Sequence, residues 1–253
     1  MTIRVGITGS TGSLGREIVK SKLGFKYSFF KGDIRNKNRI SKWISNNSFD
    51  AIIHLAAIVP IKVVNKNRKK AYEVNYIATK KLVDEVKKKK IKWFFFASTS
   101  HVYGFSRGKI KETKKTRPIS KYGQTKLRAE NYIVRSFRRK KLPYCIGRIF
   151  SFTHKKQSGD FVIPSIMKRI KKEINTFENV NHYRDFISTK DICAAINILY
   201  NNKSYGIYNI GSGKKILISD IIKIITRRNN KKVVLKNNAK KTCLVADINK
   251  MKK

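Results

Sequence analysis

An N-terminal run of a strand, a glycine loop and a helix limits the possible folds of this chain more than any other feature. Ile3–Thr8 is a short apolar run rich in β-branched residues, which is typical of a buried strand. It leads directly into TGSTGSLG, where the glycines have the spacing G-x-x-G-x-x-G. Residues 14–23 then show helical spacing. A glycine loop between a strand and a helix predicts a site for the phosphates of a dinucleotide.

Each glycine of this loop is expected to have a different structural role. Gly9 permits the tight turn out of the strand, Gly12 lets the backbone approach a pyrophosphate, and Gly15 lets the helix pack closely on the sheet. The start of the helix adds free N–H groups and a partial positive charge. We therefore expect the whole loop to bind the cofactor, that is Gly9, Ser10, Thr11, Gly12, Ser13, Leu14 and Gly15.

Strand-like and helix-like segments alternate along the rest of the chain, which predicts a parallel sheet with crossover helices. The segments become shorter and more polar after Phe150. The predicted fold is α/β, a Rossmann-type doubly wound parallel sheet with a small C-terminal α/β substrate lobe. We expect residues 1–150 to form the NAD(P)-binding Rossmann domain and residues 151–253 the substrate-binding lobe, partly interleaved with it. Further strands are expected at 27–30, 51–55, 93–97, 144–150 and 206–210, and helices at 38–45, 69–89, 121–138, 163–172, 189–200 and 219–228.

The net charge of +44 is the other prominent feature, with 59 Lys and Arg against 15 Asp and Glu. Such an excess raises the question of a nucleic-acid or membrane partner. The lysine runs are spread along the whole chain, for example at 87–90 and 240–241, and we interpret them as solvated lysines. We expect no specific nucleic acid, and keep RNA binding by this fold as an alternative of another class.

Nothing in the sequence suggests export or a membrane span. No stretch approaches the roughly 20 apolar residues that a membrane span needs, and the N-terminus lacks a signal-peptide pattern. Cys145, Cys193 and Cys243 are far apart and form neither a metal-binding spacing nor a disulfide framework. We therefore expect a cytoplasmic protein with reduced thiols and no metal site.

Asp33 follows the second predicted strand, where a carboxylate can reach the ribose hydroxyls of NAD. It can also be a simple turn or helix-capping residue. Its neighbours Lys31 and Arg35 can instead attract the 2′-phosphate of NADP. The choice between NAD and NADP stays open, with a slight preference for NAD.

Tyr122 and Lys126 are four residues apart on a predicted helix, so their side chains share a face. An ammonium group near a phenol lowers the phenol pKa, and such a tyrosine can exchange a proton with a substrate hydroxyl or carbonyl. Thr99 lies near the carboxyl end of a predicted strand, where ligands bind in such sheets. These residues, Tyr122, Lys126 and Thr99, are the predicted catalytic group.

Together these motifs resemble the extended short-chain dehydrogenase/reductases, also called the NAD-dependent epimerase/dehydratase family. The resemblance covers nearly the whole chain and includes DAIIHLAA at 50–57, STSHVYG at 98–104 and PISKYGQTKLRAE at 118–130. It implies that Tyr122 is the acid/base, that Lys126 tunes it and binds the nicotinamide ribose, and that Thr99 is the third hydroxyl. The other implied positions are Asp33 and Ile34 at the adenosine, Leu55, Ala56 and Ala57 along the cofactor, and Thr99, Ser100, Tyr122 and Arg184 at the substrate.

The resemblance also implies a nucleotide-sugar substrate. Departures from the family pattern reduce the number of reactions that fit this chain. Dehydratases of the family carry an Asp-Glu pair where this chain has Ser100 and His101, which disfavours dehydration. The short connection before Gly32 resembles the 4-keto-sugar reductases. We therefore expect an NAD(P)-dependent oxidoreductase that reduces a 4-keto nucleotide sugar, with a nucleotide-sugar 4-epimerase that retains NAD as the alternative. A homodimer formed through the helices at 69–89 and 121–138 is a further expectation.

Overall fold

A parallel sheet forms the centre of the molecule. The computed structural model describes residues 2–21, 23–59, 61–154, 157, 161–238 and 240–252. Within these residues the sheet has six strands in the order β10-β5-β4-β3-β1-β2, and all neighbouring strands are parallel. The predicted Rossmann-type fold is therefore confirmed. The strands are β1 (Ile3–Thr8), β2 (Phe25–Phe29), β3 (Ala51–His54), β4 (Trp93–Thr99), β5 (Tyr144–Ile149) and β10 (Gly206–Ile210).

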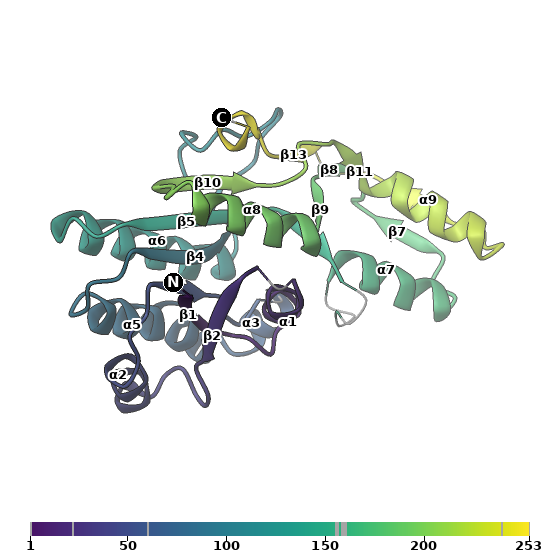
Figure 1. Ribbon diagram of the computed structural model, residues 1–253. Helices are drawn as coiled ribbons and strands as arrows, with labels where there is room; N and C mark the ends of the chain where they lie inside the picture. The colour runs from purple at the N-terminus through teal and green to yellow at the C-terminus, as the bar shows by residue number, and fades with distance from the viewer. Residues whose placement is uncertain are drawn as a thin grey trace.

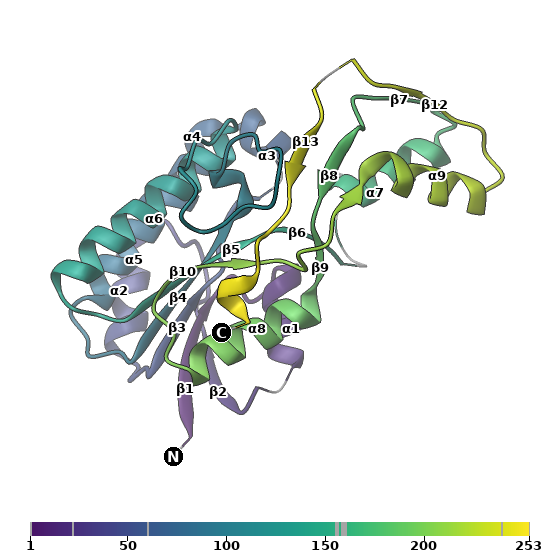
Figure 2. The same cartoon turned by 90° about the horizontal axis from the view of Figure 1, so that it is seen from above.

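Helices cover both faces of this sheet, as Figure 2 shows from above. One face packs against α1 and α8, and the other packs against α2, α5 and α6. Their amphipathic patterns are the reason, because each helix turns one apolar stripe toward the strands. The helices are α1 (Ser13–Lys20), α2 (Lys37–Ser45), α5 (Ala78–Val86), α6 (Lys121–Arg139) and α8 (Thr189–Asn201).

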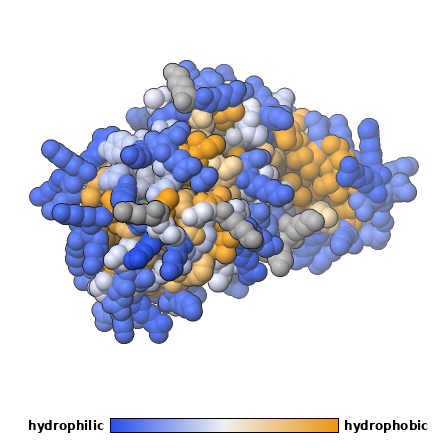
Figure 3. Space-filling view, viewed as in Figure 1, coloured by the Kyte–Doolittle hydropathy of each residue, from blue (hydrophilic) through white to orange (hydrophobic). Residues whose placement is uncertain are grey.

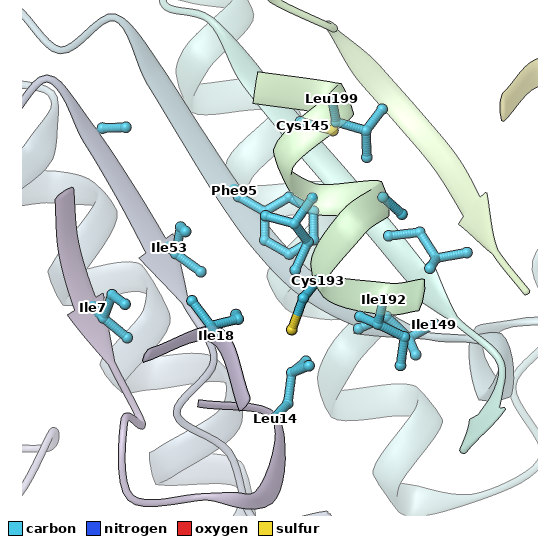
Figure 4. Close-up of a cluster of buried hydrophobic side chains, with 14 of the residues drawn as sticks. Ile7, Leu14, Ile18, Ile53, Phe95, Cys145, Ile149, Ile192, Cys193 and Leu199 are labelled. Carbon is cyan, nitrogen blue, oxygen red and sulfur yellow. The ribbon is translucent and has the colours of Figure 1, made fainter. Parts of the chain in front are cut away.

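The strands read as apolar runs because they are covered on both sides. Every residue of β3 and β5 is buried. In Figure 4, Cys193 of α8 lies near Leu14 and Ile18 of α1, with Phe95 of β4 beside them. Burying a side chain such as Phe95 contributes about 1.5–3 kcal/mol, so this core helps to fix the position of α1 and of the glycine loop before it.

The expected single helix at 69–89 is instead three consecutive pieces. Asn67 caps α4 by accepting a hydrogen bond from the Lys70 N–H at 2.9 Å, so the helix begins earlier than expected. A π-helical turn then separates α4 from α5. Such turns insert an extra residue and occur frequently at functional sites. The pieces are α4 (Arg68–Tyr72), the π turn η1 (Glu73–Ile77) and α5, and α4 is preceded by α3 (Ile61–Lys66).

The chain leaves the sheet after β5, builds a smaller lobe, and contributes α8 and β10 to the main sheet on the way (Figure 1). Two helices and short strands pack around a second apolar core in this lobe. Strands of three residues carry too little periodicity to be predicted from sequence. The elements are β6 (Ser151–Thr153), α7 (Val162–Lys171), β7 (Thr176–Glu178), β8 (His182–Arg184), β9 (Phe186–Ser188), β11 (Ile216–Leu217), α9 (Ile218–Arg228), β12 (Val234–Lys236) and β13 (Thr242–Leu244).

The surface in Figure 3 is hydrophilic around most of its outline, with hydrophobic patches in the centre and over the C-terminal lobe. This distribution agrees with polar side chains spread over the whole chain. No helix among the described residues is both long and apolar enough to cross a membrane. The remaining helical turns are η2 (Ser100–Val102) and η3 (Asn249–Met251).

Candidate functional site

The glycine loop leaves β1 at the point where the strand order reverses, between β1 and β3. Gly9 has a φ of +76°, and a Cβ there would lie 2.6 Å from the backbone N of Ala56. A Cβ at Gly15 would overlap the carbonyl oxygen of Gly9. A Cβ at Gly12 would meet only the Gly9 oxygen, at 3.4 Å, so this glycine faces open space. The loop therefore packs tightly against the protein at Gly9 and Gly15 and stays open at Gly12.

Two adjoining cavities open beside this loop, and Gly9 and Thr11 line both of them. The adenosine-side cavity has a volume of about 1000 Å³ and lies between the ends of β1 and β2 and the helices α3 and α4. The catalytic-side cavity has a volume of about 440 Å³ and lies between the loop, β4 and α6. Their position outside the carboxyl ends of parallel strands is where such sheets bind ligands.

Nearly all the predicted site residues line one of these cavities. Arg184 does not, because β8 holds it in the C-terminal lobe, where its Nη1 donates a hydrogen bond to the Tyr183 carbonyl at 2.9 Å. The adenosine-side cavity is lined by Gly9, Ser10, Thr11, Asp33, Ile34 and Ala56. The catalytic-side cavity is lined by Gly9, Thr11, Gly12, Ser13, Leu14, Gly15, Leu55, Ala57, Thr99, Ser100, Tyr122 and Lys126.

Thr99 and Tyr122 meet in the catalytic-side cavity. Thr99 ends β4, and its Oγ1 accepts a hydrogen bond from the His101 N–H at 3.2 Å, which fixes the turn that follows the strand. Burial raises the pKa of Tyr122 to about 12, and a hydrogen bond with Thr99 lowers it in part. The tyrosine is therefore a protonated phenol that can donate a proton.

Lys126 lies on the same face of α6 as Tyr122 and is almost completely buried. Burial lowers the pKa of Lys126 to about 7, and the Glu130 carboxylate raises it in part. Its Nζ lies 3.9 Å from the centre of the Phe96 ring. The expected lowering of the Tyr122 pKa by Lys126 stays a prediction, and burial of the phenol is the largest influence on this pKa.

A buried histidine supports the loop from behind. His54 Nδ1 lies 2.6 Å from Thr8 Oγ1, and His54 Nε2 lies 2.8 Å from Thr79 Oγ1. Thr8 Oγ1 in turn accepts a hydrogen bond from the Ala56 N–H at 3.3 Å. Burial lowers the pKa of His54 to about 3, with a further contribution from the charge of Lys126. A neutral His54 thus connects β1, β3 and α5 just below the cavities.

Asn75 joins the loop after β3 to helix α6. Its Oδ1 accepts a hydrogen bond from the Ile58 N–H at 2.7 Å, and its Nδ2 donates to the Ile58 carbonyl at 2.9 Å. The same Nδ2 lies 3.2 Å from Thr125 Oγ1 on α6. Asn75 belongs to the π turn, so this turn has a specific role in holding the backbone at Ile58. No local sequence signal identifies such a clamp.

The carboxylate of Asp33 is engaged within the protein. Arg35 Nη2 lies 2.6 Å from Asp33 Oδ2, and the Arg35 N–H donates to Asp33 Oδ1 at 2.9 Å. Arg35 Nη1 also lies 3.1 Å from Glu73 Oε2. Hydrogen bonds from the Arg35 side chain and backbone lower the pKa of Asp33 to about 2. Asp33, which is predicted to bind the ribose, thus lies on the cavity wall and is already paired with Arg35.

Arg184 adds positive charge near His101, which lies beside the predicted catalytic group. His101 lines the catalytic-side cavity, and its ring centre lies 5.8 Å from that of Tyr122. Burial lowers the pKa of His101 to about 4, and the charge of Arg184 adds to the shift. The Arg184 charge therefore acts on a residue of the cavity although the side chain does not line it.

A buried ion pair beneath β4 could not be predicted from the sequence. Arg148 of β5 and Glu130 of α6 are joined at 2.7 Å, and Ser98 donates a hydrogen bond to the same carboxylate. Arg148 Nη1 also donates to the Tyr103 hydroxyl at 2.9 Å. This network fixes β4 against α6 immediately before Thr99 and one helical turn beyond Lys126.

Residues 5–252 match the family model described as GDP-mannose 4,6 dehydratase. Among curated proteins, a bifunctional UDP-glucose 4-epimerase and UDP-xylose 4-epimerase of Pisum sativum is 27% identical over 250 residues, which cover 87% of this chain and 71% of the relative. A dTDP-D-glucose 4,6-dehydratase of Dictyostelium discoideum is 27% identical over 222 residues, which cover 82% of this chain and 51% of that protein.

Solved structures share the fold over almost the whole chain. The UDP-glucose 4-epimerase of Thermus thermophilus in complex with NAD has a TM-score of 0.86 at 21% identity, covering 99% of this chain and 92% of that one. RMD from Pseudomonas aeruginosa, complexed with NADPH, has a TM-score of 0.85 at 19% identity, covering 99% and 91%. At such identities these likenesses establish the fold.

Proposed function

The chain belongs to the GDP-mannose 4,6 dehydratase family, and on this basis we propose that it is an NAD(P)-dependent oxidoreductase acting on a nucleotide-activated sugar. The proposed reaction is reduction of a 4-keto sugar. The observation that carries it is the meeting of Thr99, Tyr122 and Lys126 with the glycine loop in one cavity. A loop that holds phosphates and a group that moves protons are both needed for hydride transfer at a sugar carbon.

The residues of the loop fit a dinucleotide. Gly12 presents backbone without a side chain to the cavity, and a Cβ there would have open space around it except for the Gly9 oxygen. Gly12 is also the N-cap of α1 and makes no side-chain capping bond, so the first N–H groups of the helix are available to a phosphate. When bound, the nicotinamide ring supplies the hydride donor or acceptor.

In this proposal Tyr122 donates a proton to the carbonyl oxygen of the sugar as the alcohol forms. Thr99 orients the same oxygen through its hydroxyl. Lys126 binds the nicotinamide ribose and favours the phenolate after the proton has left, because a nearby cation stabilises an anion. Arg184 is proposed to contact the sugar-nucleotide diphosphate.

A 4-epimerase is the second candidate, and the similarity to the Pisum sativum epimerase favours it. It would use the same three side chains. Dehydration is disfavoured because the cavity carries Ser100 and His101 where an acidic pair would be needed. The RNA-binding alternative gains no support from these relatives, and the charge is accounted for by dispersed lysines.

The test is incubation of the purified protein with a nucleotide-activated 4-keto-6-deoxy sugar and reduced cofactor. A reductase consumes NADH or NADPH in proportion to product, which is followed by the loss of nicotinamide absorbance. An epimerase instead interconverts UDP-glucose and UDP-galactose without added cofactor and releases NAD when denatured. Folded protein that binds neither cofactor would refute the proposal.

A homodimer and a cytosolic location are also part of the proposal. Helices α5 and α6 lie side by side on one face. Lys80 of α5 and Lys87, which follows α5, lie over the Tyr132 ring of α6, at 5.5 and 5.7 Å from its centre. These two lysines are thus engaged in contacts between the two helices. Sedimentation equilibrium tests the dimer. The unpaired thiols of the chain suit a reducing compartment.

A further inference from the structure

The rim of the adenosine-side cavity is strongly basic. Lys31 follows β2, the strand that lies beside β1 in the sheet, and reaches the cavity from one side. Lys66, the last residue of α3, and Lys70 of α4 line it from the other side. All three side chains are exposed at the rim. Three cations from three separate segments of the chain therefore line one cavity.

The acidic groups nearby are bound mainly by Arg35, although the charge of Lys70 also lowers the pKa of Asp33. Asp33 is the only carboxylate among the described residues that line this cavity, and it is bound by Arg35. Glu73 is bound by the same arginine. Lys81 fixes this arrangement by donating a hydrogen bond from Nζ to the Arg35 carbonyl at 2.9 Å. The ion pairs found within the described residues include none of Lys31, Lys66 and Lys70.

The same cavity has an apolar wall suited to an adenine ring, formed by Phe30, Ile34 and Val74. The glycine loop borders it through Gly9 and Thr11, where the pyrophosphate would enter. The adenosine ribose would therefore lie between the apolar wall and the loop, which is also the region that the lysines surround.

We propose that Lys31, Lys66 and Lys70 form a subsite for the 2′-phosphate of NADP(H), so that this chain binds NADPH in preference to NADH. The inference rests on the proposed function, since it assumes that a dinucleotide occupies this cavity. The two cofactors differ only at this phosphate, which carries about −1.5 to −2 charges near neutral pH. A ribose hydroxyl would gain little from the lysines, and the occupied carboxylate of Asp33 leaves it without a free acceptor.

The direct test is titration of the purified protein with NADPH and with NADH, followed by nicotinamide fluorescence. We expect NADPH to bind at least roughly tenfold more tightly, because charge-assisted hydrogen bonds to a phosphate are stronger than those to a hydroxyl. The difference should shrink as salt is added, since exposed charges are screened. Equal binding, or tighter binding of NADH, would overturn the inference.

Single-residue variants test which lysines bind the 2′-phosphate. Lys31→Ala and Lys70→Ala should each weaken NADPH binding by roughly three- to tenfold and change NADH binding by less than about twofold. Lys172→Ala, at the exposed end of α7 in the other lobe, is the matched control and should change neither. Equal losses for both cofactors in the Lys31 and Lys70 variants would show that these lysines do not read the 2′-phosphate.

Adenosine 2′,5′-bisphosphate and 5′-AMP separate this inference from the proposed function. We expect the bisphosphate to compete with NADPH more strongly than 5′-AMP does, and Lys31→Ala to reduce that advantage. If neither dinucleotide binds, the proposed function fails together with the inference. If NADH binds tightly and NADPH weakly, the proposed function stands and only the 2′-phosphate subsite is refuted.

Discussion

Arg148 and Glu130 form an ion pair that is almost fully enclosed by protein. Arg148 Nη2 lies 2.7 Å from Glu130 Oε2, and Arg148 Nε donates to both carboxylate oxygens at 3.2 and 3.1 Å. The exposed fractions of the two side chains are 5% and 1%. Since Ser98 binds the same carboxylate, one buried pair joins β5, β4 and α6 directly behind the proposed catalytic group.

Replacing Glu130 by Gln should therefore destabilise the fold by about 3–5 kcal/mol, because it leaves Arg148 as an uncompensated buried charge. Urea unfolding followed by circular dichroism measures the change. The matched control is Glu173→Gln, which breaks the exposed pair with Lys231 and should destabilise the fold much less, because water screens exposed charges. Similar losses in the two variants would contradict the importance of burial here.

Tyr122→Phe should lower turnover by roughly 10²–10⁴-fold and leave cofactor affinity nearly unchanged, since it removes only the proton donor. Steady-state rates and cofactor titration measure the two effects separately. Tyr132→Phe, on the same helix where it contacts α5 and its hydroxyl donates to Asp84, is the control and should keep full turnover. A Tyr122→Phe protein with unchanged turnover would refute the assigned mechanism.

Gly12→Val should weaken cofactor binding by roughly 10–100-fold while the protein stays folded. Only the Gly9 oxygen would lie near the new Cβ, at 3.4 Å, so the side chain projects into the space proposed for the pyrophosphate. Gly15→Val, by contrast, should unfold or strongly destabilise the protein, because its Cβ would overlap Gly9 backbone. Thermal unfolding combined with NADH titration distinguishes these outcomes, and undiminished NADH affinity in Gly12→Val would count against the loop.

His54 should make stability depend on pH. Its pKa is about 3 in the folded protein, so the unfolded state, with a histidine pKa near 6.5, binds more protons between these values. Stability is therefore lost as the pH falls from about 6.5 toward about 3, and the histidine alone contributes a loss of about 2 kcal/mol at about pH 5. Urea unfolding at neutral and acidic pH should show that His54→Gln loses less stability on acidification than the unchanged protein does.

His182→Gln serves as the control for that measurement, because this side chain is only partly buried. His182→Gln should lose nearly as much stability on acidification as the unchanged protein does. If His54→Gln and the unchanged protein lose stability in parallel, the buried histidine is not the group that titrates.

The glycine loop, the strands of the main sheet and helix α6 could be predicted because their signals are local. A strand, a glycine spacing and a helix each depend on neighbouring residues, and Tyr122 and Lys126 share a face through helical geometry alone. The family resemblance was likewise carried by short motifs in order. The positions of these elements are confirmed, while the roles of the individual residues remain proposals.

Contacts between distant segments could not be predicted in this way. The ion pair of Arg148 with Glu130, the clamp of Asn75 on Ile58 and the pairing of short strands in the C-terminal lobe join residues that no local pattern connects. Arg35, which binds the nearby Asp33, also pairs with Glu73 of the distant π turn. The order of residues alone thus specified which chemical groups this protein carries and on which elements they lie. Only the packing of its sheet and helices established which of them are buried, paired or left free to bind a ligand, because burial and pairing depend on neighbours that are remote in the chain.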